Sequence, residues 1–204
     1  MTDAAGLLLE LFAVPAPRAT LQWPRPAASM SPLSTTMMVA VTGDGVCVRI
    51  SGRATISASD DFKELICGLC ARGHRQFVLD LAGCPIMDST FLGVLAGLSY
   101  GVAEARCEGA PPQFELFNPN DRVLGLLDNL GVLELFKVVQ CAPLKDGDFQ
   151  PVTPSAETSK ADLTRISLEA HKLLMSLNPE NVARFKDVAR FLEEDLKRQT
   201  GGNG

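Results

Sequence analysis

The fold of this chain is decided by residues 76–95, which read QFVLDLAGCPIMDSTFLGVL. The stretch begins with a strand pattern that is apolar on both faces, as expected of a central strand covered by helices. A short loop leads to Asp88, Ser89 and Thr90, three residue types that commonly cap helices, and the apolar side chains after them recur on one helix face. A buried strand followed by an amphipathic helix predicts a parallel α/β sheet.

Strand and helix patterns alternate on both sides of this stretch. Residues 37–41 and 46–50 are β-prone runs that flank TGDG, whose glycines allow a tight hairpin. The other expected elements are a helix near 58–72 capped by Ser57 or Ser59, a helix from Ser89 to about Ala105, a strand at 113–117, a helix that starts within 118–121 and ends at Leu130, and a strand at 135–139. This order predicts an α/β domain at residues 37–141, with a mainly parallel or mixed sheet of about five strands and crossover helices.

The segments outside this domain have a different composition. Residues 13–36 hold five of the thirteen prolines and lack a sustained helix or strand period, so we expect the segment 1–36 to be disordered or to precede the true translation start. The Met cluster at Met30, Met37 and Met38 raises this second alternative. Residues 142–158 have the Pro, Asp, Ser and Thr content of a linker.

The tail at residues 159–198 carries apolar side chains at the alternating three- and four-residue spacing of two amphipathic helices. A capping box at 159–162 starts the first helix, and Pro179 starts the second. We therefore expect a C-terminal α-hairpin whose apolar stripe is buried either on the α/β domain or on a second chain, as a homodimer, and the sequence favours neither. We also expect this hairpin to take no part in the chemistry of the site.

The composition is that of a soluble globular protein, with 204 residues, 46% apolar and 21% charged residues, a net charge of −5 and a pI near 5.1. Because clustered Lys and Arg are lacking, we expect no nucleic-acid partner. The longest low-charge run, 91–103, is too short to span a membrane, and the first residues make a poor secretory signal. We therefore expect a soluble cytoplasmic protein.

Six cysteines without regular spacing indicate reduced thiols rather than a disulfide framework. They are Cys47, Cys67, Cys70, Cys84, Cys107 and Cys141. Cys67 and Cys70 form one C-x-x-C, but no second pair accompanies it and the surrounding pattern is an apolar helix face. We interpret these two cysteines as core or near-core residues and expect no metal site.

The inventory of catalytic residues argues against an enzyme. The two histidines, His74 and His171, lie about 100 residues apart, and neither has an evident partner, so we expect solvated or interface side chains. No phosphate-binding loop and no nucleophile elbow occurs. The run 77–83 is similar to the nucleophile strand of haloacid dehalogenase phosphatases, but Ala82 stands where that motif needs a second Asp, so we expect Asp80 to bond the loop after its strand. We expect no cofactor and no turnover.

The strand at 77–81, the loop and the segment 87–95 together resemble the STAS family of anti-sigma factor antagonists. The resemblance extends from about Val39 to Val139 and includes SGR at 51–53 and LLDNLGVLELF at 126–136. It departs from the usual pattern at Phe91, where the family mostly has Gly, and at Ala54 and Thr55, where the family often has an acidic residue. The resemblance implies a STAS-like α/β fold.

The resemblance also implies a function and a site. In this family the first hydroxyl residue after the Asp is phosphorylated by a partner that is both an anti-sigma factor and a serine/threonine kinase. This implies Ser89 as the phosphorylation site, with Thr90 as the alternative, and partner binding through Asp88, Ser89, Thr90, Phe91 and Thr55. The unphosphorylated form would sequester the anti-sigma factor and so regulate sigma-factor-dependent transcription. The alternative is a non-switching STAS scaffold subunit of a multiprotein signalling or transport assembly.

Overall fold

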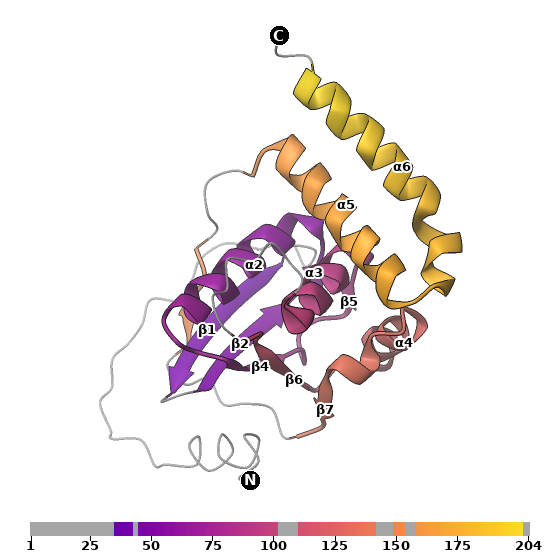
Figure 1. The fold of residues 1–204 in the computed structure, drawn as a ribbon. Coiled ribbons are helices and arrows are strands. Elements are labelled where there is room, and N and C mark those ends of the chain that lie inside the picture. Colours follow the sequence, from indigo (N-terminus) through magenta and orange to yellow (C-terminus); the bar gives the residue numbers. More distant parts are fainter. Residues whose placement is uncertain (1–34, 43–44, 102–109, 142–148, 154–157, 202–204) are drawn as a thin grey trace, which may run out of the picture.

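The computed structural model describes residues 35–42, 45–101, 110–141, 149–153 and 158–201. Most of the segment 1–36, and with it the choice between disorder and a later translation start, lies outside these residues, as does Cys107. Within them the chain is an α/β domain with a pair of long helices at its C-terminal end (Figure 1). This confirms the predicted fold class, including the C-terminal α-hairpin.

The central sheet has six strands in the order β7-β6-β4-β2-β1-β8. Their bounds are β1 Thr36–Thr42, β2 Gly45–Ser51, β4 Gln76–Asp80, β6 Gln113–Phe117, β7 Lys137–Val139 and β8 Gln150–Pro151. The strands β2, β4, β6 and β7 run parallel, whereas β1 pairs antiparallel with β2 as the expected hairpin and with β8 at the sheet edge. The strand β8 lies within the segment predicted to be only a linker.

A second, two-stranded sheet was missed by the sequence analysis. It pairs β3, Arg53–Ala54, in parallel with β5, Ile86–Met87, so that Ala54 lies opposite Met87. This pairing places Asp88, the residue after β5, beside Ile56, where the helix that follows β3 begins. The small sheet therefore brings two helix N-termini together.

The helices of the domain gather on one face of the sheet. Their bounds are α2 Ile56–Ala71, α3 Ser89–Tyr100 and α4 Asp121–Asn129, followed by the 3-10 turn η1 Leu133–Leu135. Side chains of all three α-helices share one core cluster with the sheet, for example Phe62, Leu95 and Val123 with Leu79. The opposite face carries only a small cluster that contains Cys47, Val78 and Phe117. The expectation that helices cover both faces of β4 is therefore wrong for the described residues.

Several predicted boundaries shift. The helix α3 ends at Tyr100 instead of near Ala105, because Gly101 adopts a left-handed φ of 67° and closes it. The predicted strand at 135–139 is divided between η1 and β7. The helix α4 begins as predicted, with the Asn120 side chain accepting a hydrogen bond from the Val123 amide.

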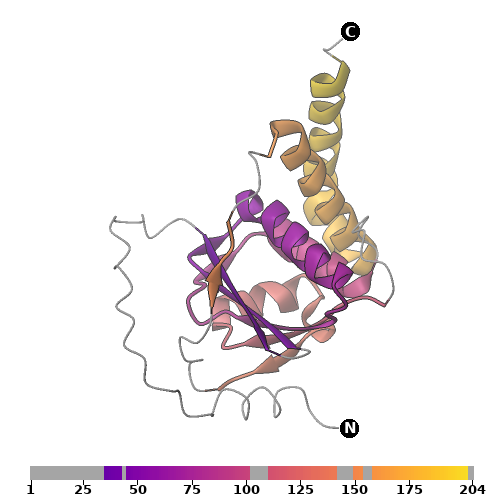
Figure 2. The ribbon, with the colours of Figure 1, turned by 90° about the vertical axis from the view of Figure 1, so that its left-hand side faces the viewer.

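The C-terminal hairpin consists of α5, Lys160–Leu177, and α6, Glu180–Gly201. Its α5 helix lies across α3 and also contacts α2, while α6 packs on α5 at the outside, as two views show (Figures 1 and 2). The apolar stripe of α5 is thus buried on the chain's own domain. Of the two alternatives that the sequence left open, packing on the domain or on a second chain, α5 shows the first. The α6 helix keeps Val182, Val188 and Phe191 exposed.

Candidate functional site

The site begins at Asp88, which connects two helices. Asp88 follows β5 and is the N-cap of α3, where its Oδ1 accepts a hydrogen bond from the Phe91 amide at 2.8 Å. Its Oδ2 accepts a second hydrogen bond from the Ile56 amide at 2.8 Å, in the first turn of α2. The predicted Ser57 or Ser59 cap of α2 is therefore wrong, because Thr55 holds the N-cap position without a side-chain cap bond and Asp88 supplies the acceptor from another segment.

Ser89, the first residue of α3, is half-buried, and its hydroxyl lies against the C-terminal hairpin. The Ser89 Oγ atom is 3.0 Å from Nε2 of His171 on α5. The His171 Nδ1 atom is 2.7 Å from the Ser167 carbonyl oxygen. A carbonyl oxygen only accepts hydrogen bonds, so in the neutral imidazole Nδ1 carries the proton, and Nε2 accepts the hydrogen bond that the Ser89 hydroxyl donates.

The state of His171 follows from its surroundings. The side chain is 5% exposed, and this burial lowers the pKa of His171 from its ordinary value, while the Ser167 carbonyl and the Asp88 charge act in the opposite direction. The ring also lies 4.8 Å from the Phe185 ring of α6, measured between centroids. The expectation that neither histidine has a partner is therefore wrong for His171.

Thr90 and Phe91, two of the residues predicted to contact a partner, point inward. Thr90 is 5% exposed, and its Oγ1 lies 3.1 Å from the Ser167 Oγ of α5. Phe91 is fully buried, with its ring centroid 5.0 Å from that of Phe62 on α2. The ring that replaces the usual glycine is therefore part of the core, and neither side chain offers a surface to a partner while α5 is in place.

Thr55 and Asp88 retain accessible surface beside Ser89. Thr55 is half-buried, and its hydroxyl lies 3.0 Å from that of Ser57. Asp88 is also half-buried, with both carboxylate oxygens engaged by backbone amides. Of the five predicted contact residues, Thr55, Asp88 and Ser89 therefore form a small accessible patch at the starts of α2 and α3.

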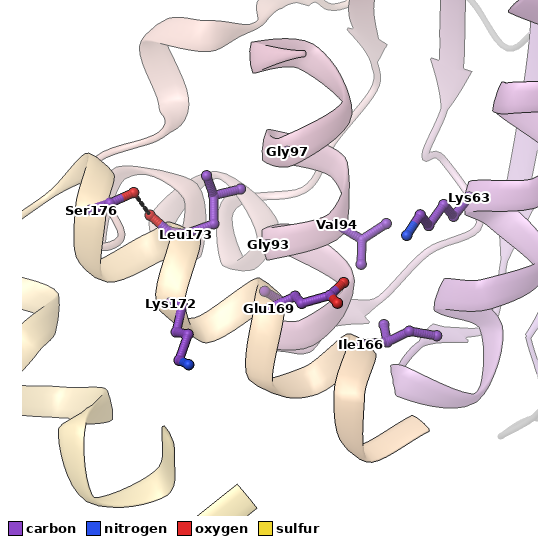
Figure 3. A pocket seen from close by; sticks show the side chains of 10 residues that line it. Lys63, Gly93, Val94, Gly97, Ile166, Glu169, Lys172, Leu173 and Ser176 are labelled. Carbon is purple, nitrogen blue, oxygen red and sulfur yellow. Dashed lines mark hydrogen bonds between the residues drawn. The ribbon is translucent and has the colours of Figure 1, made fainter. Parts of the chain in front are cut away.

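Two hollows adjoin α3. One, of about 430 Å³, lies beside Ser89 and is lined by Leu92, Arg122, Arg184 and Phe185, among others. The other, of about 400 Å³, lies between α2, α3 and α5 (Figure 3). It is lined by Lys63, Gly93, Val94, Gly97, Ile166, Glu169, Ala170, Lys172, Leu173 and Ser176. Neither hollow was foreseen from the sequence, because each joins elements far apart in the chain.

At the second hollow, α3 and α5 approach each other very closely. A Cβ atom added at Gly93 of α3 would lie 2.7 Å from the Ala170 Cβ and 2.8 Å from the Ala170 carbonyl oxygen of α5. Real Cβ atoms are not found at such distances, so this crossing requires glycine at position 93. The presence of Gly93 thus sets how deeply α5 sits on the start of α3.

The remaining candidate residues lie elsewhere. Asp80 bonds the loop after β4, as predicted, because its Oδ1 accepts from the Ala82 amide at 3.2 Å, and its Oδ2 accepts from the Arg49 Nε at 2.8 Å. Cys70 is buried and Cys67 is half-buried, as expected of core and near-core residues. Among the residues that the structure describes, no group of three or more His, Cys, Asp or Glu side chains could hold a metal ion. No helix in that part of the chain is both long and apolar enough to cross a membrane.

The fold and the site define a STAS-type α/β domain extended by a helical hairpin. The family model of the STAS domain matches residues 36–142, which is more than half of the chain, and the chain therefore belongs to the STAS domain family. A search of curated proteins found no match.

Solved structures of anti-sigma factor antagonists are similar to the chain at low sequence identity. The unphosphorylated form of the anti-sigma factor antagonist SpoIIAA is 18% identical, with a TM-score of 0.43, over 51% of this chain and 87% of that one. An anti-sigma factor antagonist from Mycobacterium paratuberculosis is 17% identical, with a TM-score of 0.44, over 54% and 89% of the two chains. The phosphorylated form of SpoIIAA, a Bacillus cell fate determinant, is 17% identical, with a TM-score of 0.39, over 51% and 90%.

Proposed function

We propose that this STAS domain is a phosphorylation-switched protein-binding module and not an enzyme. In its unphosphorylated form it binds a cytoplasmic partner that is both an anti-sigma factor and a serine/threonine kinase, and so frees a sigma factor for transcription. The kinase transfers the γ-phosphoryl group of ATP to the Ser89 oxygen, ADP leaves, and the hydroxyl proton passes to a base. The phosphorylated domain no longer binds.

The observation that carries this proposal is the position of Ser89 as the first residue of α3, next to its N-cap Asp88, within the residues that match the family model. The first amides of a helix lack intrahelical acceptors, and the helix dipole is positive there, so a phosphate is tolerated at this end. Thr90 remains the alternative acceptor, but its 5% exposure favours Ser89. The domain itself is therefore expected to stay folded when it is phosphorylated.

The loss of binding then arises at the surface. A phosphoserine carries a charge of about −1.5 to −2 and would stand beside the Asp88 carboxylate and Thr55. A partner that docks over the starts of α2 and α3 would meet this charge directly. A loss of about 3 kcal/mol weakens binding more than a hundredfold, and like-charge contacts reach that magnitude.

The test is co-purification from the native cell followed by mass spectrometry, with Ser89→Ala and Ser89→Asp variants compared with the wild-type chain. We expect a kinase-type anti-sigma factor to be retained by Ser89→Ala and lost by Ser89→Asp, at similar melting temperatures. Ser57→Ala, at an exposed hydroxyl of the neighbouring helix, is the matched control. Undiminished binding of the stoichiometrically phosphorylated protein would refute the switch, and a large assembly in place of a kinase would favour the scaffold function.

Catalysis by the chain itself needs a separate test, because Ser89 and His171 are hydrogen-bonded. We expect the purified protein to hydrolyse neither ATP nor GTP. Turnover that survives repurification and disappears in both Ser89→Ala and His171→Gln would make Ser89 a nucleophile and would contradict the proposed binding function.

A further inference from the structure

The C-terminal hairpin makes direct contact with the proposed phosphorylation site. His171 and Ser167 of α5 bond the hydroxyls of Ser89 and Thr90, and Ala170 between them packs on the backbone of Gly93. These contacts occupy the first two turns of α3. The hairpin therefore covers the same helix start over which the proposed partner docks.

We propose that the hairpin is an intramolecular cover of the Ser89 site and that the Ser89–His171 hydrogen bond is its latch. Phosphorylation of Ser89, or docking of a partner over the start of α3, then requires α5 to move away. This inference rests on the proposed function in so far as Ser89 is the residue that is modified. It adds a second occupant, α5 itself, that competes with the partner for one surface.

The chemistry of the latch makes closure and phosphorylation incompatible. The Ser89 hydroxyl donates a hydrogen bond to the buried Nε2 of His171 at 3.0 Å, a distance that leaves no room for a phosphoryl group between the two atoms. Phosphoserine has no hydroxyl proton to donate, and Nε2 can bond its oxygens only if the imidazole takes up a proton, which burial disfavours because it lowers the pKa of His171. In addition, a kinase must reach the Ser89 oxygen in line with its own phosphate donor, and that oxygen faces α5 in the closed form.

The seam between α5 and α3 combines a close crossing with an adjoining hollow. Gly93 and Ala170, which meet at the crossing, line the hollow of about 400 Å³ between α2, α3 and α5 (Figure 3). Ile166, Ala170 and Leu174 of α5 belong to the main core cluster, so movement of α5 exposes apolar surface and the closed form is favoured.

The two ends of α5 differ in how they are held. At the α5–α6 turn, the fully buried Asn181 donates hydrogen bonds to the carbonyl oxygens of Leu130 and Leu174, both at 2.9 Å. At the other end, Thr158 donates one hydrogen bond to Asp60 of α2 at 2.9 Å. The Asn181 end is therefore the natural pivot, and the end at Thr158 is the one that swings.

The experiment measures hydrogen exchange of the full chain by mass spectrometry, with phosphoserine installed at position 89 during translation. We expect the α5 amides to exchange at least about tenfold faster in this protein than in the wild type, with β4 unchanged, because the latch is lost and the closed form is sterically blocked. Phosphoserine at position 57 is the matched control, since it places the same charge in the first turn of α2, at an exposed hydroxyl that makes no hydrogen bond to α5 among those of the described residues.

A second variant opens the cover without touching Ser89. Gly93→Ala places a methyl group against Ala170 and should speed α5 exchange to a similar extent, whereas Gly125→Ala, at a helical glycine of α4 with nothing within 4 Å, should behave as the wild type. Unchanged β4 exchange reports that the domain remains folded in each variant.

Unchanged α5 exchange in the protein with phosphoserine at 89 would overturn the proposal, and so would equal acceleration by phosphoserine at 57. Slower exchange would also overturn it, because it would mean that Arg122 and Arg184, which line the hollow beside Ser89, hold the phosphate and tighten the hairpin. These results do not depend on a kinase. A finding that Ser89 is never modified in the cell would instead refute the proposed function and leave the cover intact.

Discussion

Replacing Asp88 by alanine should destabilise the protein much more than the loss of an ordinary helix cap. Asp88 accepts one 2.8 Å hydrogen bond from the Phe91 amide of α3 and another from the Ile56 amide of α2. Loss of an N-cap costs about 1 kcal/mol, and the second bond, also to a charged acceptor, adds about 1.5 to 3 kcal/mol. We therefore expect a loss of about 2 to 4 kcal/mol, which for a chain of this size lowers the melting temperature by about 5 to 15 °C.

The matched control is Ser159→Ala, which removes a single N-cap, the 3.1 Å hydrogen bond from the Asp162 amide to the Ser159 hydroxyl. It should cost about 1 kcal/mol. Asp88→Asn should fall between the two, because its amide oxygen can replace one acceptor while its NH2 group faces the other backbone N–H. Urea unfolding followed by circular dichroism measures all three. If Asp88→Ala were no less stable than Ser159→Ala, Asp88 would not connect the two helices as we infer.

Three other changes test the electrostatics of the fold. Because burial lowers the pKa of His171, the unfolded chain takes up a proton at a higher pH than the folded chain does. The contribution of His171 to the free energy of unfolding is therefore complete above pH 6.5 and is lost as the pH falls from there toward the lowered pKa. Urea unfolding across this range should show a pH dependence that His171→Gln reduces, and an unchanged dependence would contradict burial of His171 as its cause. Asp80→Ala should cost about 2 to 4 kcal/mol by leaving Arg49 without its carboxylate, and the double variant Arg49→Met/Asp80→Leu should recover part of that loss. Burial raises the pKa of Cys47 to about 12, so iodoacetamide at pH 8 should alkylate the half-buried Cys67 and leave Cys47 unmodified in the native protein, as peptide mass spectrometry would report.

The sheet and its helices could be predicted because their patterns are local. Alternating apolar residues in β2 and the helical spacing in α3 each span several residues, which is enough to reveal a period. The pairs β3–β5 and β1–β8 could not be found in this way, since β3, β5 and β8 have two residues each and one of them ends in Pro151. Such short bridges depend on where the surrounding elements bring the chain, not on their own sequence.

The site shows the same division between local and distant contacts. The helix cap Asp88 and the neighbouring Ser89 were evident from adjacent residues, but the acceptor of the Ser89 proton is His171, 82 residues further along the chain. One signal was available: Ser167 and His171 lie four residues apart on α5, at the border of its apolar stripe, where two buried polar side chains need partners. Which partners they find could not be inferred, because the sequence did not decide between packing on the domain and packing on a second chain.

The strength of the latch decides what kind of control the hairpin can exert. If closure is favoured by about 1.4 kcal/mol, the open form makes up about a tenth of the population, and a partner that needs it binds about tenfold more weakly than it would to an open site. Such a cover weakens partner binding without preventing it. If closure were favoured by about 4 kcal/mol, the penalty would be about a thousandfold, and the kinase would have to bind the hairpin itself to gain access. The two hydrogen bonds to Ser89 and Thr90 contribute about 1 kcal/mol each, and the buried side chains of Ile166 and Leu174 add about 1.5 to 3 kcal/mol each. These magnitudes favour the more tightly closed cover. By linkage, a mutation that opens the hairpin and leaves the sequence of α3 unchanged, such as Ala170→Leu, should then strengthen partner binding by no more than the factor by which it raises the open population.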